Sequence, residues 1–221
     1  MPDRDPRYKL IVFDWDGTLL DSASGIVSCI QEASREMGLE VPSRDRASHV
    51  IGLGLRDSLR FAVPDLPDSG YAEFAARYRT HFLACEEAMT LFPGVPELLV
   101  NLCEAGYALA VATGKSRKGL DRALSSSGLS ACFVATRCAD ETHPKPHPAM
   151  LNELMTELSR SPAEVLMIGD TSHDLDMAAS ARVDAVAVTY GAHPEDILRS
   201  RAPKGIVASI RELESWLKTH A

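Results

Sequence analysis

The spacing of apolar residues along the chain predicts short buried strands that alternate with amphipathic helices. Brief apolar runs bounded by Gly, Asp, Thr or Pro are typical of buried strands. They lie at residues 10–13, 107–112, 133–137, 165–168 and 185–188. From residue 92 onward these strands are separated by helical patterns, at 95–104, 117–125, 149–158, 175–181 and 210–217. The last of these helices has Ser209 as its N-cap and Glu212 at the capping-box position. Strands alternating with helices predict a Rossmann-like α/β fold, a parallel sheet with helices on both faces.

Between the first two predicted strands, the pattern has helical periodicity only. Apolar residues at positions 71, 74, 78, 82, 85 and 89 form one stripe of a long helix, and a second helix is expected over 22–37. A Gly-rich turn at 51–55 precedes a short amphipathic stretch. Residues 22–91 contain no strand pattern, so we expect an all-helical insertion after the first strand.

Composition limits the possible partners and compartments. The chain has 221 residues, 45% of them apolar and 24% charged, which is ordinary for a soluble globular protein. Its net charge of -8 argues against a surface that coats nucleic acid. The first seven residues are too charged for a signal peptide, and no apolar run is long enough to span a membrane. Five cysteines without a Cys-x-x-Cys pair indicate reduced thiols. We expect a cytoplasmic protein, monomeric or homodimeric, that binds neither nucleic acid nor membranes.

Polar side chains follow three of the predicted strands. Asp14 and Asp16 come directly after the first, Thr113 and Gly114 end the second, and Asp170 and Asp174 follow the fourth; Lys145 lies in a Pro-rich loop. Taken alone, the stretch from Asp14 to Gly17 fits a hairpin turn as well as a metal site. Because parallel sheets bind ligands beyond the carboxyl ends of their strands, we expect these side chains to converge on one pocket.

The residue types in this expected pocket favour phosphoryl chemistry. Four carboxylates (Asp14, Asp16, Asp170, Asp174) without a His or Cys cluster suit Mg²⁺. The Thr113 hydroxyl, the Gly114 backbone and the Lys145 ammonium can hold phosphoryl oxygens. One carboxylate can then attack phosphorus, and a second can protonate the leaving oxygen and later activate water.

Four stretches resemble the motifs of the haloacid dehalogenase-like hydrolases, in that family's order and across nearly the whole chain. They are Asp14-x-Asp16-Gly17-Thr18, Thr113-Gly114, Lys145-Pro146 and Gly169-Asp170-Thr171-x-x-Asp174. The resemblance implies that Asp14 is the nucleophile and a metal ligand, and that Asp16 is the acid/base and binds Mg²⁺ through its backbone carbonyl. It implies that Thr113 and Lys145 hold the phosphoryl group, that Asp170 binds the metal and that Asp174 supports it.

Residues 21–91 resemble the family's helical cap, and we call this segment the cap; residues 1–20 and 92–221 would form the catalytic core. Within the family, the chain is most similar to phosphoglycolate phosphatase-type enzymes, through Asp14-Trp15-Asp16-Gly17-Thr18 and Ile51-Gly52-Leu53-Gly54. The resemblance therefore implies a Mg²⁺-dependent phosphatase of a small phosphorylated metabolite. Phosphoglycolate is the first candidate; pyrophosphate, a nucleotide or a sugar phosphate remain open.

Other functions fit the sequence less well. The dehalogenases of the family lack the second aspartate, which is present here as Asp16. The sugar-phosphate mutases grip a second phosphate with a cap Arg and a cap Lys; all six lysines lie outside the cap, and Arg56 sits one position from the expected Arg. Arg56 could contact the far end of a substrate, and a solvated surface arginine fits equally well. Receiver-type signalling domains hold a phosphoryl group with similar residues. In those domains the acidic pair comes before the Lys along the chain, whereas in this sequence Lys145 comes before the acidic pair.

Overall fold

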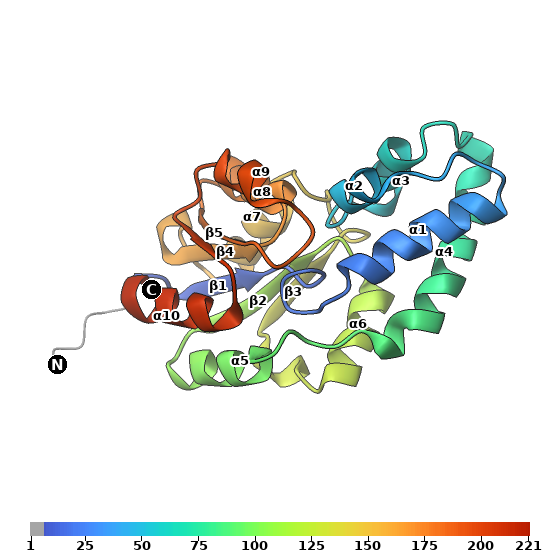
Figure 1. Ribbon diagram of the computed structural model, residues 1–221. Helices are drawn as coiled ribbons and strands as arrows, with labels where there is room; N and C mark the ends of the chain where they lie inside the picture. Colours follow the sequence, from blue (N-terminus) through green and yellow to red (C-terminus); the bar gives the residue numbers. More distant parts are fainter. Residues whose placement is uncertain (1–6) are drawn as a thin grey trace, which may run out of the picture.

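The computed structural model describes residues 7–221 as one parallel sheet between two layers of helices, with a helical lobe at one end (Figure 1). The expectation about a signal peptide concerns residues 1–7, most of which lie outside the described residues. The six strands are β1 (Leu10–Phe13), β2 (Ala108–Thr113), β3 (Ala135–Cys138), β4 (Val165–Gly169), β5 (Asp184–Val188) and β6 (Gly205–Val207). They pair in the order β3-β2-β1-β4-β5-β6, all parallel. The predicted Rossmann-like α/β fold is confirmed.

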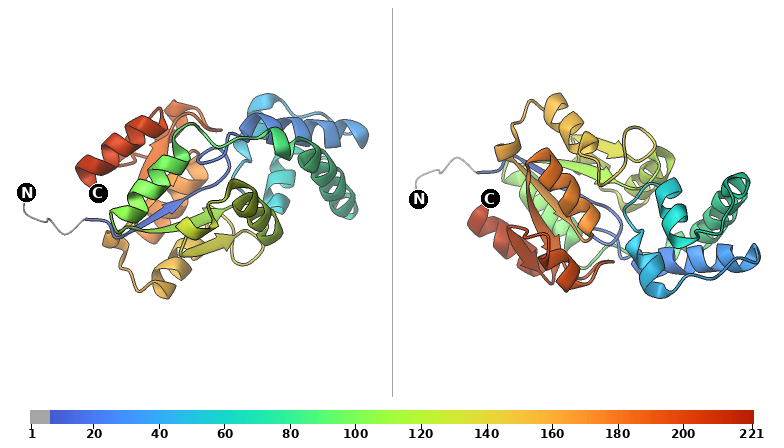
Figure 2. Two further views of the ribbon diagram at one scale, coloured as in Figure 1. Left: turned by 90° about the horizontal axis from the view of Figure 1, so that it is seen from below. Right: turned by 90° about the horizontal axis from the view of Figure 1, so that it is seen from above.

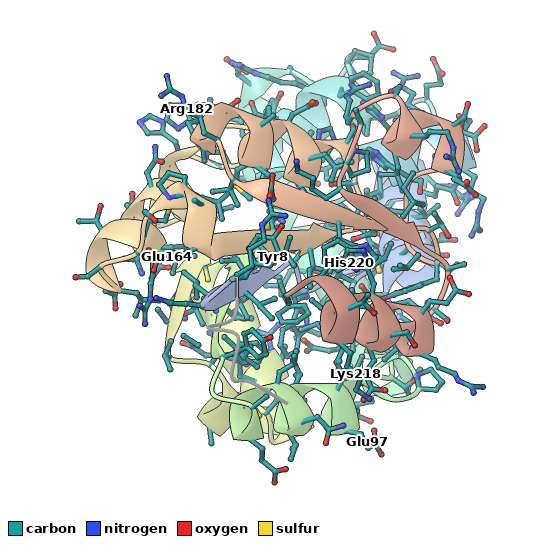
Figure 3. The ribbon with its side chains drawn as sticks, turned by 90° about the vertical axis from the view of Figure 1, so that its left-hand side faces the viewer. Tyr8, Glu97, Glu164, Arg182, Lys218 and His220 are labelled. Atoms are coloured by element: carbon teal, nitrogen blue, oxygen red, sulfur yellow. The ribbon has the colours of Figure 1, made fainter. Side chains whose placement is uncertain are left out.

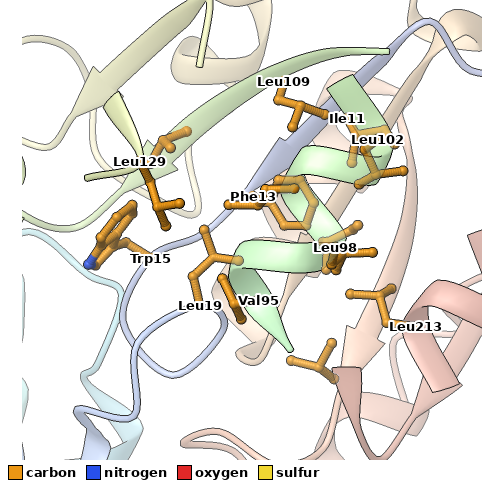
Figure 4. Close-up of a cluster of buried hydrophobic side chains, with 14 of the residues drawn as sticks. Ile11, Phe13, Trp15, Leu19, Val95, Leu98, Leu102, Leu109, Leu129 and Leu213 are labelled. Atoms are coloured by element: carbon orange, nitrogen blue, oxygen red, sulfur yellow. The ribbon is translucent and has the colours of Figure 1, made fainter. Parts of the chain in front are cut away.

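Different helices cover the two faces of the sheet, because side chains alternate along each strand. In β1, Ile11 and Phe13 belong to one buried cluster, and Leu10 and Val12 to the other. Figure 4 shows Ile11 and Phe13 beside Leu98 on the first face. That face is covered by α5 (Val95–Glu104), α6 (Arg117–Ser127) and α10 (Ile210–His220), and the second by α7 (Ala149–Glu157), α8 (Ser172–Ala181) and α9 (Glu195–Arg199). Burial on both faces explains why the strands read as continuous apolar runs.

The lobe consists of α1 (Ala23–Glu36), α2 (Arg44–His49), α3 (Leu55–Ala62) and α4 (Tyr71–Cys85). Figure 2 shows it beyond the end of the sheet in both views. It has a cluster of buried side chains of its own, which includes Ile26, Phe74 and Phe82. The long helix expected over residues 71–89 ends at Cys85, and a single 3₁₀ turn follows it. The helices of the cap therefore have a core separate from the two clusters on the sheet.

The opposite end of the sheet, which Figure 3 views directly, is closed by polar contacts. The Tyr8 hydroxyl donates to Asp184 Oδ2 at 2.9 Å, and Arg7 pairs with the same oxygen at 2.7 Å. Burial, aided by the hydrogen bond to Asp184, raises the pKa of Tyr8 to about 12. Among residues 7–221, no helix is both long and apolar enough to cross a membrane.

Candidate active site

The carboxyl ends of β1, β2 and β4 bring the predicted polar side chains together. The chain runs from β1 to β2 and β3 on one side and to β4, β5 and β6 on the other, so the strand order reverses next to β1. Such a switch point leaves a crevice beyond the strand ends. Asp14 follows β1, and its backbone N–H donates to the Ile168 carbonyl of β4 at 2.9 Å. Thr113 ends β2 and Asp170 follows β4; all three side chains are fully buried.

Lys145 lies between two of the carboxylates. Its Nζ is 2.8 Å from Asp14 Oδ1 and 2.7 Å from Asp174 Oδ1, and its side chain has no exposed surface. Asp174 is held in turn as the third residue of α8, where its Oδ2 accepts from the Thr171 N–H and hydroxyl. The Pro-rich loop therefore places the Lys145 ammonium next to Asp14, and the capping box of α8 places the Asp174 carboxylate next to Lys145.

The buried carboxylates around Lys145 outnumber the buried cations. Asp14, Asp170 and Asp174 each have a carboxylate oxygen within 4.8 Å of the others, and Lys145 is the cation that pairs with two of them. Burial raises the pKa of Asp14 well above its ordinary value. The charge of Lys145 lowers this pKa, and the charges of Asp174 and Asp170 raise it further, so the net shift is upward. Burial and then Asp174 raise the pKa of Asp170 to about 7. For Lys145, burial alone would lower the pKa, but the two carboxylates outweigh it and raise the pKa. The three carboxylates thus have a deficit of positive charge.

A divalent cation fits this donor set. Asp14 Oδ1 accepts from the Trp15 N–H at 2.6 Å, whereas Asp14 Oδ2 is buried and has no hydrogen-bond partner among the described residues. A buried carboxylate oxygen without a partner is costly unless a proton or a cation satisfies it. Hard oxygen ligands of this kind suit Mg²⁺. The predicted ligands Asp14, Asp170 and Asp174 are therefore placed together, whereas a contact through the Asp16 backbone carbonyl stays a prediction.

Asp170 is fixed by contacts that the sequence analysis did not assign. Its Oδ1 accepts from the Thr18 hydroxyl at 2.7 Å, and its Oδ2 accepts from the Ala192 N–H at 2.7 Å. Gly17 has a φ of 79° and lies so close that an added Cβ would overlap the Asp170 carboxylate. The glycine is thus needed for its turn and for the approach of this carboxylate.

The Asp16 side chain is not part of the group formed by Asp14, Asp170 and Asp174, and it has polar partners of its own. Its Oδ1 accepts from the Ser22 hydroxyl at 2.7 Å and pairs with Lys115 Nζ at 3.0 Å. The Lys115 ammonium also lies 4.7 Å from the centre of the Phe82 ring of α4. Lys115 was not among the predicted site residues, although it stands two positions after Thr113 at the same strand end.

Gly114 and the Gly-rich turn of the cap approach each other closely. A Cβ on Gly114 would lie 2.6 Å from the Gly52 carbonyl oxygen. A Cβ on Gly52 would lie 3.4 Å from Thr171 Oγ1, and one on Gly54 3.1 Å from Pro144 Cβ. The Gly-rich turn of the cap therefore packs against three loops of the core, namely the loops after β2 and β4 and the Pro-rich loop.

Two buried histidines of the core contact the end of α2, just before this turn. His173 Nε2 and His193 Nε2 lie 2.7 and 3.1 Å from the carbonyl oxygen of His49, at the end of α2. His193 Nδ1 accepts the Ser172 N–H at 3.0 Å, so its Nε2–H is the donor to His49. Burial lowers the pKa of His193 to about 4, which keeps this ring neutral at pH 7. His173 is therefore a buried contact to the cap.

Arg56 does not join the other predicted residues. It is exposed on α3, and its guanidinium lies 5.7 Å from the centre of the Tyr71 ring. The buried face of α3 consists of Ser58, Leu59 and Ala62, which turns Arg56 outward. In this structure Arg56 is a surface residue, and its predicted contact with substrate lacks structural support.

Comparison with known proteins identifies the family. Residues 11–188 match the model of the haloacid dehalogenase-like hydrolases. The chain belongs to that family. It is 37% identical to the probable phosphatase IndB of Dickeya dadantii over 92% of this chain and 91% of the relative. It is 35% identical to the tyrosine-protein kinase PtkA of Mycobacterium tuberculosis (98% and 74%) and 31% identical to the phosphoglycolate phosphatase of Vibrio vulnificus (94% and 95%).

Solved structures agree with the family assignment. The crystal structure of a predicted phosphoglycolate phosphatase from Haemophilus somnus 129pt has a TM-score of 0.83 and 26% identity, and covers 96% of this chain and 99% of its own. The predicted family and the predicted enzyme class, a hydrolase of phosphoric monoesters, are confirmed by these matches.

Proposed function

We propose that this haloacid dehalogenase-like hydrolase is a Mg²⁺-dependent phosphatase of small phosphorylated metabolites that works through an aspartyl-phosphate on Asp14. The observation that carries the proposal is the Asp14 carboxylate itself. Its Oδ1 is held by Lys145 and the Trp15 N–H, whereas its Oδ2 has no partner among the described residues. Asp14 also lines the cavity between core and cap. One oxygen is thus fixed, and the other is left for bonding to metal or phosphorus.

The proposed reaction has two steps. A carboxylate oxygen of Asp14 bonds to phosphorus while the bond to the alcohol oxygen breaks, and Asp16 gives that oxygen its proton. Water then attacks the phosphorus, Asp16 takes its proton, and the bond to Asp14 breaks. Lys145, the Thr113 hydroxyl and the backbone of Gly114 hold the phosphoryl oxygens. Mg²⁺, bound by Asp14 and Asp170 next to Asp174, would neutralise charge that the carboxylates and the phosphoryl group bring together.

Residues 21–91 are proposed to act as a lid over this site. The Gly52 turn seated on Gly114, and the ion pair between Arg122 of α6 and Glu86 after α4 at 3.2 Å, support a closed position of this lid. Closure would exclude water from the reacting groups, as lids commonly do.

The decisive experiment is the Asp14→Asn variant with p-nitrophenyl phosphate and saturating Mg²⁺. We expect turnover to disappear, because an amide cannot form the acyl phosphate. Asp176→Asn is the matched control, since Asp176 lies on the surface and pairs with Arg201. Substantial activity of Asp14→Asn would refute the mechanism.

Assays of the wild type with other substrates test the alternatives. Stable phosphorylation of the wild type without release of phosphate would indicate a signalling domain. Isomerisation of a sugar phosphate without net hydrolysis would indicate a mutase. Transfer to protein tyrosine, the activity named for the mycobacterial relative, would appear as phosphotyrosine on an added protein. Phosphoglycolate, named for the relative from Vibrio vulnificus, is the first metabolite to assay.

A further inference from the structure

The cavity in front of Asp14 and Asp16 is larger and more apolar than a two-carbon substrate requires. Its volume is about 440 Å³, within the ~300–1,000 Å³ typical of sites for drug-sized ligands. With about 30 Å³ per water molecule in the liquid, this volume corresponds to about 15 waters. A bound phosphoglycolate would leave much of the cavity to water.

Residues of the cap form more than half of the wall of this cavity, and most of these cap residues are apolar. Those with accessible side chains include Leu53 and Leu55 at and after the Gly-rich turn, and Tyr78 and Leu83 on α4. Two of them, Leu55 and Leu83, are 42% and 45% exposed, and are thus among the few large apolar side chains of residues 7–221 that remain exposed. Exposed apolar surface that lines a concave site marks a place where a ligand is buried.

The cations of the cavity are not arranged for the carboxylate of a small acid. Lys115 is paired with Asp16 at 3.0 Å, and Arg122 is paired with Glu86 at 3.2 Å. Arg79 and Lys118 also line the cavity, but both are exposed. These last two can attract an anionic substrate to a protein of net charge -8, which is a long-range effect and requires no contact.

We infer that the leaving group of the substrate is an apolar alcohol of about six or more carbons, an alkyl or aryl chain that fills the cap wall. This inference rests on the proposed phosphatase function. The phosphoryl group would lie at Asp14 and Lys145, the ester oxygen at Asp16, and the carbon chain against Leu55 and Leu83.

A series of n-alkyl phosphates from ethyl to hexyl tests the inference, because the leaving alcohol keeps the same chemistry along the series. We expect kcat/KM to rise about fourfold per methylene group, and thus about 250-fold over the four methylenes from ethyl to hexyl, since each buried methylene adds a constant increment. Hexyl phosphate should also exceed phosphoglycolate. Competitive inhibition by the matching alkylphosphonates should follow the same order, which separates binding from turnover.

The Leu83→Asn variant should flatten the dependence of kcat/KM on chain length, because it replaces an apolar part of the cap wall by an amide. Val41→Asn is the control, because Val41 is another partly exposed cap residue (37%) that does not line the cavity. A flat series, or a preference for phosphoglycolate over hexyl phosphate, would overturn the inference and leave the phosphatase proposal standing. Failure of every ester to turn over with Mg²⁺ would overturn both.

Discussion

Replacing Lys145 by Met should destabilise the protein strongly. The Lys145 Nζ lies within 2.8 Å of two carboxylates, and the side chain has no exposed surface. Removing one partner of a buried ion pair typically costs about 3–5 kcal/mol, because the remaining charges are left uncompensated. For a domain of this size that cost lowers the melting temperature by about 6–20 °C.

The loss should depend on pH in a defined direction. Without the ammonium, the already raised pKa of Asp14 rises further, so the folded variant keeps a proton that the unfolded chain releases near its ordinary pKa, about 4. The folded state then binds more protons than the unfolded state above about pH 4, and stability falls as pH rises. The free energy lost by Lys145→Met should therefore be larger at pH 8 than at pH 5.

Urea denaturation in EDTA at both pH values measures this loss. Lys204→Met is the matched control, because Lys204 is half-exposed and pairs with Asp184 at 3.5 Å, a surface contact worth at most about 1 kcal/mol. If Lys145→Met were as stable as Lys204→Met at pH 8, or lost the same free energy at both pH values, the electrostatic account of the site would be wrong.

Three further outcomes follow from the same geometry. Calorimetric titration should show Mg²⁺ binding that weakens up to about tenfold per pH unit below pH 7, because the pKa of Asp170 is about 7 and its proton must leave before it binds metal; an affinity independent of pH would contradict this. Thr18→Val removes the hydroxyl that donates to Asp170 and should lower Mg²⁺ affinity about 10–100-fold; equal affinity of variant and wild type in the same titration would exclude this role. Gly114→Ala should lower kcat/KM with little change in melting temperature, because the added methyl group displaces the Gly52 turn of the cap; full activity of the variant would show that the turn yields freely.

The central strands and the polar strand ends could be read from the sequence for a physical reason. Strands buried on both faces are continuous apolar runs, and in β1 the run stops where the chain leaves the sheet at Asp14. Parallel pairing then brings the ends of β1, β2 and β4 to one edge without further information. This is why Asp14, Thr113 and Asp170 could be grouped before any coordinates were known.

Short or peripheral elements could not be read in the same way. The edge strand β6 has three residues, only one of them fully buried, and α9 has five residues, too few for a periodic pattern. The contacts of Lys115 with Asp16 and of His193 with His49 join residues about 100 or more positions apart. The second contact depends on where the cap lies on the core, and neither contact is specified by spacing or composition.

The position of the cap links substrate choice to the phosphoryl site. The turn at Gly52 lies against Gly114 and Thr171, which belong to the loops after β2 and β4 that also carry the residues proposed to bind the phosphoryl group and the metal. Asp16 lies on the cap side of this arrangement, against Lys115, which in turn contacts Phe82. A leaving group held by the cap is therefore placed with its ester oxygen toward the residue proposed to protonate it. Because the loops proposed to hold the phosphoryl group also contact the cap turn, a substrate too short to reach the cap wall would lose the contacts that would hold the proposed lid closed during the reaction.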